Sequence, residues 1–219
     1  MFSEHHLCFA ASLTLWVSSY VYCDRNLGGK EAFARYSPLH ELHSAVVVIL
    51  GLASLLIGDD ERFSEGVPIA FSVPYFIVDL FDCIRRRDAP FFVHAAVSIG
   101  IASMSYSHPV LYGMRLSSRG YLIELSTLQL HRWKKSKTKS DFALFFAAFT
   151  VCRIVWLPWV FANVVRAIGI RHVISQACAL LCFLQFVWWF KMIPMLLNYR
   201  GKISTVDGTV YGNEKEKDT

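Results

Sequence analysis

Long uncharged stretches recur along the chain, and each is about as long as a membrane-crossing helix. Such a helix needs roughly 17 to 25 apolar residues to cross ~30 Å of hydrocarbon. A further stretch, 108–131, is less obvious because it carries Arg115, Arg119 and Glu124. The pattern predicts an all-α, polytopic membrane protein with about seven transmembrane helices. The clear candidates are the ranges 7–23, 39–58, 67–84, 90–107, 142–165 and 173–193.

Composition agrees with this class and excludes others. Of the 219 residues, 54% are hydrophobic and 18% are charged, whereas soluble domains carry about 25% charged residues. Disordered chains, disulfide-stapled miniproteins and nucleic-acid-binding arms need denser charge or cysteine. The six cysteines lie in or beside the predicted spans without metal-ligand spacing. We therefore expect no disulfide framework, no metal site, no tightly bound cofactor and no nucleic-acid partner.

The positive charges predict how the chain is oriented. With seven spans and a lumenal N-terminus, fifteen of the 22 Lys and Arg residues lie on the cytosolic side and five on the lumenal side, with Arg153 and Lys191 inside spans. Removing the span at 108–131 weakens this split to twelve against eight. Cytosolic loops carry an excess of Lys and Arg. The sequence therefore favours seven spans, a lumenal N-terminus and a cytosolic C-terminus.

The first apolar stretch has two interpretations, a signal peptide or a retained first helix. It lacks a basic segment at its start, and no small-x-small cleavage site precedes Asp24, although signal peptides have both. We expect the helix to be retained.

The last five residues resemble a sorting signal. Lys215 and Lys217 stand five and three positions from the C-terminus, as in the KxKxx signal by which coat proteins return membrane proteins to the endoplasmic reticulum. Such a signal acts on a cytosolic tail, where the charge distribution places it. The alternative is a solvated charged end with chance spacing. The sequence favours an endoplasmic reticulum membrane protein whose tail is recognised by coat proteins.

Ionisable side chains inside the predicted spans mark a candidate site. Each costs about 2.5 to 3.5 kcal/mol at the bilayer centre, so it tends to face a cavity or a partner. They recur at helical spacing, which gives several helices one polar face. Polar faces on neighbouring helices predict an internal cavity. The faces consist of His40 and His43; Tyr75, Asp79 and Asp82; His94, Ser98 and Ser105; Glu124, Thr127 and His131; and Arg153.

Several short motifs stand in a recognisable order. They are Arg35-Tyr36-Ser37 to His43-Ser44, Tyr75 to Asp79, His94, Glu124-Leu-Ser-Thr127 to Arg132-Trp133, and Phe145-Phe146 to Arg153. This order resembles the TLC-domain family, which includes the ceramide synthases and the translocating-chain-associated membrane proteins, over residues 35 to about 195. The resemblance implies six spans in a barrel around a lipid-accessible cavity, with the first helix peripheral. It divides the chain into a first helix and cytosolic loop (1–34), a TLC-like domain (35–199) and a cytosolic tail (200–219).

One further detail is similar to the ceramide synthases. Those enzymes carry a His-His pair followed, eleven and twelve residues after its first histidine, by Ser and Tyr. Here His94 is followed at those distances by Ser105 and Tyr106, but Ala95 replaces the second histidine. The family's catalysis is thought to reside in that pair, so Ala95 argues against a simple transfer of the activity.

The residues themselves indicate what chemistry such a site would perform. The His94 imidazole could attack an acyl-CoA thioester or take a proton from an attacking amine or hydroxyl. Asp79 or Asp82 could accept from its other ring nitrogen and fix the tautomer. Acyl-CoA would then be the co-substrate. The candidate donors to a developing oxyanion are Ser105, Tyr106 and Arg153.

Two hypotheses follow from different functional classes. In the first, a non-catalytic TLC protein binds a lipid or fatty acyl chain in its bundle and regulates membrane lipid composition or lipid and cargo handling. In the second, an acyl-CoA-dependent acyltransferase acts on a lipid or sphingoid acceptor, with His94, Asp79 and Asp82 as catalytic residues. Structural alternatives are a satisfied core histidine at position 94 and a buried Arg153–Glu124 ion pair. The lipid-binding or supporting residues are His43, Tyr75, Ser98, Ser105, Tyr106, Glu124, His131 and Arg153.

Overall fold

The computed structural model describes residues 2–26 and 32–199, and the regular secondary structure of this part of the chain is all helical, without strands. The all-α prediction is confirmed. The elements are α1 (Phe2–Asn26), α2 (Ala32–Ile57), α3 (Gly66–Arg86), α4 (Ala89–Ser107), α5 (Pro109–Gly113), α6 (Leu116–Tyr121), η1 (Leu122–Glu124), α7 (Leu125–Ser136), α8 (Lys139–Phe149), η2 (Thr150–Trp156), α9 (Leu157–Ile168) and α10 (Val173–Leu197).

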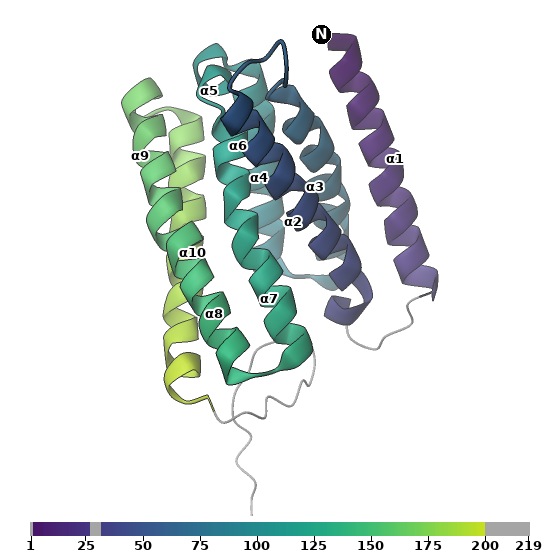
Figure 1. Cartoon of the computed structure of the whole chain (residues 1–219), viewed down its shortest axis with the longest axis vertical. Coiled ribbons are helices and arrows are strands. Elements are labelled where there is room, and N and C mark those ends of the chain that lie inside the picture. Colours follow the sequence, from purple (N-terminus) through teal and green to yellow (C-terminus); the bar gives the residue numbers. More distant parts are fainter. Residues whose placement is uncertain (1, 27–31, 200–219) are drawn as a thin grey trace, which may run out of the picture.

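Five of the described helical stretches are long and apolar enough to cross a membrane. Two more segments, α1 and the continuous α6–η1–α7, do not meet that criterion but lie alongside the five in one bundle (Figure 1). The described ends of the chain lie at opposite ends of this bundle (Figure 1). We call the end that holds Phe2 and α5 the upper end, and the end that holds the α7–α8 connection the lower end. The five stretches are 36–57, 66–86, 89–107, 139–168 and 173–197.

Short connections at the lower end force neighbouring helices to run antiparallel. Arg87 ends α3 in the left-handed conformation with φ 57°, and Lys137 ends α7 with φ 54°. The side chains of Asp88 and Thr138 then accept hydrogen bonds from the backbone N–H groups of Phe91 and Asp141 and so cap α4 and α8. Such caps satisfy N–H groups that a helix start leaves without a partner.

The sequence alone suggests one continuous helix over 108–131, but the structure shows a break in this segment. It is broken after α5, where Arg115 adopts a left-handed conformation with φ 53°. This turn directs the guanidinium to Asp60, 3.0 Å away, and to the Ser54 hydroxyl, 2.6 Å away. The charged residue therefore stays at the upper end, and the part that runs down the bundle begins at Leu116.

The stretch 139–168 is continuous but contains a wider turn in its middle. Residues Thr150–Trp156 form a π-helix of seven residues between α8 and α9. Such segments are rare and occur frequently at functional sites. This one carries Arg153 into the centre of the bundle.

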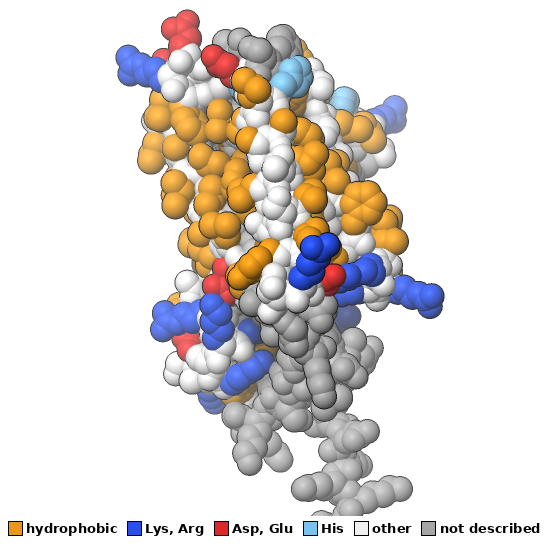
Figure 2. All heavy atoms as spheres, turned by 90° about the vertical axis from the view of Figure 1, so that its right-hand side faces the viewer, with side chains coloured by type: hydrophobic (Ala, Val, Ile, Leu, Met, Phe, Trp, Pro, Cys, Tyr) orange, Lys and Arg blue, Asp and Glu red, His pale blue; other side chains and the backbone are white. Residues whose placement is uncertain are grey.

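The outer surface fits a lipid environment. Figure 2 shows a band of hydrophobic side chains around the middle of one face, with charged side chains at both ends and Lys and Arg gathered at the lower end. Large apolar side chains are exposed on several helices, among them Leu56, Phe81, Val155 and Phe183. Apolar exposure on this scale is expected where the solvent is hydrocarbon. The polytopic membrane architecture is confirmed.

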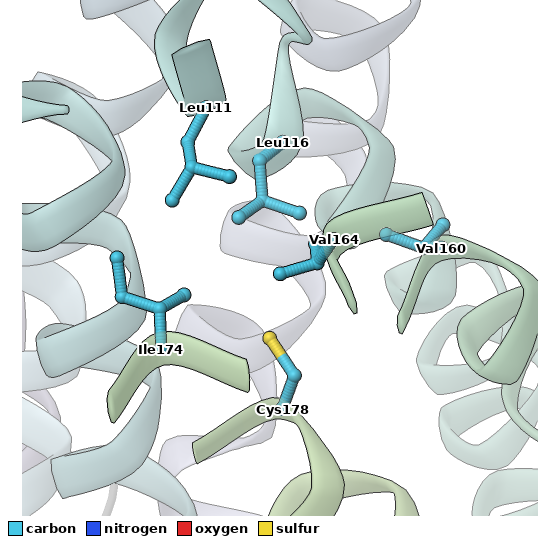
Figure 3. Close-up of a cluster of buried hydrophobic side chains, with 6 residues drawn as sticks. All are labelled: Leu111, Leu116, Val160, Val164, Ile174 and Cys178. Atoms are coloured by element: carbon cyan, nitrogen blue, oxygen red, sulfur yellow. The ribbon is translucent and has the colours of Figure 1, made fainter. Parts of the chain in front are cut away.

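Two apolar clusters hold the last helices against the rest of the bundle. At the upper end, buried side chains from α5, α6, α9 and α10 converge (Figure 3). At the lower end, Trp133, Phe142, Phe145, Phe149 and Met192 join α7, α8 and α10. The middle of the bundle lies between these clusters, and polar side chains meet there. The upper cluster consists of Leu111, Leu116, Val160, Val164, Ile174 and Cys178.

Candidate functional site

A cavity lies inside the bundle among α3, α4, α6, η1, α9 and α10. Its volume, counted as the space that the centre of a water molecule can occupy, is about 60 Å³. Five polar side chains line it, namely His94, Ser98, Ser117, Tyr121 and Glu124. The rest of its wall is mainly apolar and includes Ile101, Leu116, Leu157, Val160, Phe161 and Leu181. We call this space the His94 cavity.

His94 brings an unsatisfied polar atom to the cavity. Its Nδ1 atom is buried and has no hydrogen-bond partner among the described residues. The ring packs edge-on against Phe76 and Trp188, with centroid distances of 6.3 and 5.9 Å. A buried polar group without a partner costs about 1 to 3 kcal/mol. The imidazole is therefore available to a polar group of a ligand.

Tyr121 contributes a second polar atom to the same cavity. Its hydroxyl makes no hydrogen bond of normal geometry within the described part of the chain, although Ser72 and Ser117 lie near it. The residue comes from the last turn of α6, three positions before Glu124. The sequence analysis missed Tyr121, although its helical spacing from Glu124 placed both on one face.

Glu124 faces the cavity as one half of a buried ion pair. It is 7% exposed and accepts a hydrogen bond of 2.9 Å from the Ser44 hydroxyl of α2. Its Oε1 atom lies 3.5 Å from Nη2 of Arg153. Buried charges need such partners because they have left water.

Arg153 joins three neighbouring elements at mid-bundle. Its Nε donates to the Ser126 hydroxyl at 2.7 Å, its Nη1 to Oε1 of Gln185 at 3.0 Å, and its Nη2 to the Thr127 hydroxyl at 2.8 Å. These contacts and the Glu124 pair link η2 to η1, α7 and α10. Arg153 therefore fixes the wall of the His94 cavity. Gln185 was not predicted as a site residue, because it is one of two amides in the apolar span 173–193 and carries no other signal.

Asp79 and Asp82 line a different and smaller cavity, of about 10 Å³, between α1, α2 and α3. Asp82 is 2% exposed and accepts hydrogen bonds from the Tyr20 hydroxyl at 2.9 Å and from Arg85 at 3.4 Å; Arg86 Nε lies 2.6 Å from its other oxygen. Since His94 Nδ1 has no partner in the described chain, neither aspartate orients that nitrogen in this structure. We call this second space the Asp82 cavity.

His43 and Tyr75 lie close to the Asp82 cavity as a stacked pair. Their ring centroids are 3.6 Å apart and nearly parallel. Nε2 of His43 is 2.8 Å from the Ser72 hydroxyl, and the Tyr75 hydroxyl is 2.6 Å from Nδ1 of His40. These groups are satisfied inside the core.

The remaining predicted site residues lie toward the two ends of the bundle. Near the upper end, the Ser105 hydroxyl is 2.6 Å from that of Ser117, and the Tyr106 hydroxyl is 2.9 Å from Nδ1 of His5. Eleven residues of helix separate Ser105 from His94, which is about 16 Å. Near the lower end, Nδ1 of His131 lies 2.9 Å from the Ser37 hydroxyl. The structure therefore does not bring these residues to His94.

The sequence analysis also missed a buried acid at the upper end. Glu65 is 1% exposed and accepts hydrogen bonds from the Ser54 hydroxyl at 2.7 Å and from the backbone N–H of Ser118 at 3.0 Å. Burial raises the pKa of the Glu65 carboxyl above its ordinary value. It stands in a loop rich in acidic residues, where a solvated carboxylate was the natural expectation.

His, Cys, Asp and Glu side chains are also the usual protein ligands of metal ions. Among residues 2–26 and 32–199, no group of three or more His, Cys, Asp or Glu side chains is arranged to hold a metal ion.

A multi-pass helical bundle with an apolar outer surface and a mainly apolar internal cavity defines an integral membrane protein. A family model described as the TLC domain matches residues 4–194. The chain therefore belongs to the TLC-domain family, a family of lipid-related membrane proteins. The match takes in α1 as well as the range 35–194. Comparisons with curated proteins and with solved structures gave no match.

Proposed function

We propose that this protein binds the acyl chain of a membrane lipid in the His94 cavity and thereby regulates membrane lipid composition or the handling of lipid and cargo. One observation carries the proposal: a mainly apolar cavity at mid-bundle is lined by His94, whose buried Nδ1 atom has no partner among the described residues. Apolar walls suit a hydrocarbon chain, and a few convergent polar groups fix the orientation of a ligand.

The size of the cavity adds a requirement. A space of about 60 Å³ admits water but is small for a ligand. A long acyl chain needs more room, so its entry requires the apolar side chains of α9 and α10 to move apart from α4 and α6. Binding of this kind selects the open arrangement of the bundle.

Photochemical labelling tests this proposal. The purified full chain would be exposed to a fatty acid with a diazirine near the middle of its chain, and the labelled peptides would be identified by mass spectrometry. Ser98→Trp fills the cavity and is expected to lower labelling about fivefold or more, because a bulky ring excludes the chain.

Ser103→Trp is the matched control, because Ser103 lies on the same helix with its side chain exposed. It should be labelled like the wild type, on peptides of α4, α6, α9 and α10. Equal labelling of the Ser98→Trp variant, or labels confined to the outer faces of the helices, would contradict the proposal.

A second function, acyl transfer from acyl-CoA, is favoured by the same free nitrogen. In this reaction a nitrogen of His94 attacks the thioester carbonyl, the C–S bond breaks, and coenzyme A leaves as its thiol with a proton. The acyl-imidazole then passes its acyl group to an amine or hydroxyl of the acceptor lipid. Ala95 in place of a second histidine, and the separate position of Asp82, make this the weaker candidate.

Intact-mass analysis separates the two functions. Transfer predicts an acyl mass on the peptide that contains His94 after incubation with acyl-CoA, and loss of that mass in His94→Ala. Simple binding predicts no covalent mass, and His94→Ala should retain photochemical labelling within about threefold, since most of the binding energy comes from apolar contact.

We also propose that the lower end faces the cytosol of an endoplasmic reticulum membrane. The gathering of Lys and Arg at that end supports this orientation (Figure 2). Lys215 and Lys217, which would be recognised by coat proteins, lie outside the described residues. Replacing both by Ser is expected to move the protein to later compartments of the secretory route in fluorescence microscopy. Unchanged localisation would contradict the role of the tail.

A further inference from the structure

Arg119 differs from the other arginines that are partly or fully buried in the bundle. Arg86, Arg115 and Arg153 each lie beside a carboxylate. Arg119 is half-buried on α6, yet within the described residues no carboxylate comes within salt-bridge distance of it. A guanidinium at the edge of a membrane needs an anion or water to satisfy its charge.

The backbone and a ring hold the Arg119 side chain in one place. Its Nε donates to the carbonyl of Met114 at 2.8 Å, so the side chain reaches back toward the upper end. The guanidinium carbon lies 5.6 Å from the ring centre of Trp159, which is 45% exposed on α9. Neither Nη1 nor Nη2 makes a hydrogen bond to the described chain.

The seam between α6 and α9 is fixed around this pair. The indole N–H of Trp156 donates to the backbone carbonyl of Arg119 at 2.9 Å, and Trp156 and Trp159 have centroids 4.8 Å apart. The position of Arg119 is one helical turn, about 6 Å, below Arg115, which binds the upper loop through Asp60. Paired tryptophans and an arginine at this depth are typical of the boundary between headgroups and hydrocarbon.

We propose that Arg119, Trp156 and Trp159 form a binding site for the phosphate of a glycerophospholipid on the membrane-facing seam of α6 and α9. The two free Nη groups form the fork that matches phosphate oxygens. The indole rings would pack along the glycerol and upper acyl carbons. The site lies outside the His94 cavity and does not depend on the function proposed above.

Lipid binding to the full chain tests the site. Delipidated protein in mild detergent would be titrated with a phosphatidylglycerol and with a diacylglycerol that carries the same chains, and bound lipid counted by native mass spectrometry. Arg119→Gln is expected to weaken phosphatidylglycerol binding about tenfold, the equivalent of one charge-assisted hydrogen bond. Diacylglycerol binding should not change, because it has no phosphate.

Arg166→Gln is the matched control, because Arg166 is an exposed arginine in the last turn of α9, away from Trp159 in its first turn, and donates to the Asn163 side chain at 3.4 Å. It should bind phosphatidylglycerol within about twofold of the wild type, as expected for a screened surface charge. An equal loss in both variants, or no loss in Arg119→Gln, overturns the proposal. So does an Arg119-dependent affinity for oleate equal to that for phosphatidylglycerol, since the site would then be a carboxylate site.

Trp159→Leu provides a second variant that keeps the charge. It removes the ring beneath the guanidinium and is expected to weaken phosphatidylglycerol binding about threefold, in line with a cation–π contact of ~0.5 to 1 kcal/mol. If Arg119→Gln does not yield folded protein, this variant decides. Wild-type affinity for phosphatidylglycerol in Trp159→Leu then rejects the site.

Discussion

The two cavities of the bundle differ in whether their polar groups have hydrogen-bond or ion-pair partners. The Asp82 cavity is small, and its Asp82 and His40 groups are held by Tyr20, Arg86 and Tyr75. The His94 cavity is larger and mainly apolar, and it leaves an imidazole nitrogen without a partner among the described residues. Clustered ionisable residues therefore serve the structure at the Asp82 cavity, whereas unsatisfied polar atoms mark the His94 cavity as the candidate ligand site.

The largest expected effect concerns the Glu124–Arg153 ion pair, which borders the His94 cavity. Glu124→Ala would leave Arg153 as a buried charge without its counter-ion, which costs about 3 to 5 kcal/mol. Thermal unfolding in detergent should show a midpoint lowered by about 6 to 20 °C, at ~2 to 4 °C for each kcal/mol.

Two companions make this test specific. Arg153→Met added to Glu124→Ala removes both charges and should recover part of the loss. Arg132→Ala breaks an exposed pair with Asp141 and should change stability by less than about 1 kcal/mol. If Glu124→Ala lost no more stability than Arg132→Ala, the Glu124–Arg153 pair would not stabilise the bundle.

A smaller loss is expected at the Asp82 cavity. Asp82→Ala leaves the Tyr20 hydroxyl and Arg86 without their partner, and should destabilise the protein by about 2 to 3 kcal/mol. The effect is below that of Glu124→Ala because Arg85 and Arg86 reach solvent. The same unfolding measurement applies. If Asp82→Ala were neutral, the structural interpretation of this cavity would fail.

Substitution of the satisfied histidine should have a moderate effect. His43→Phe keeps the ring that stacks on Tyr75 but leaves the Ser72 hydroxyl unpaired. We expect a loss of about 1 to 2 kcal/mol. The variant His43→Phe with Ser72→Ala should restore part of it, because both polar groups are then gone. If the double variant recovered no stability, the loss in His43→Phe would come from altered packing and not from the unpaired hydroxyl.

The smallest expected effect is the most informative for the comparison. His94→Phe removes a nitrogen that lacks a partner in the described chain. Stability should stay within about 1 kcal/mol of the wild type or rise, because no hydrogen bond is broken. A loss as large as that of His43→Phe would show that the two cavities do not differ in the way described.

The hydrophobic pattern predicts most of the fold because membrane spans need little more than length and apolarity. The runs 39–58, 67–84, 90–107 and 173–193 correspond to helices α2, α3, α4 and α10 within a few residues at most ends. The break before Leu116 could not be predicted, since it depends on Asp60 and Ser54, which are distant in sequence from Arg115.

The candidate site was predicted only in part, because helical spacing shows which residues share a face but not which faces meet. His94, Ser98 and Glu124 do meet at one cavity. Asp82 turns instead to Tyr20 of the first helix, a residue with no signal of its own. Ser105 shares the face of His94 but lies three helical turns away, so a shared face did not mean a shared site.

The π-helix between α8 and α9 has a consequence for how changes of length in this chain should behave. In an α-helix each residue turns the chain by about 100°. Removal of one residue from α8 would therefore rotate all of α9 by that amount, and would turn Val160 and Val164 out of the upper cluster. Removal of one residue from Thr150–Trp156 differs, because the wide turn holds one residue more than an α-helical turn and then closes to an ordinary one. The seven residues of the π-helix are therefore the part of this span where the loss of one residue leaves the inward faces of α8 and α9 in place.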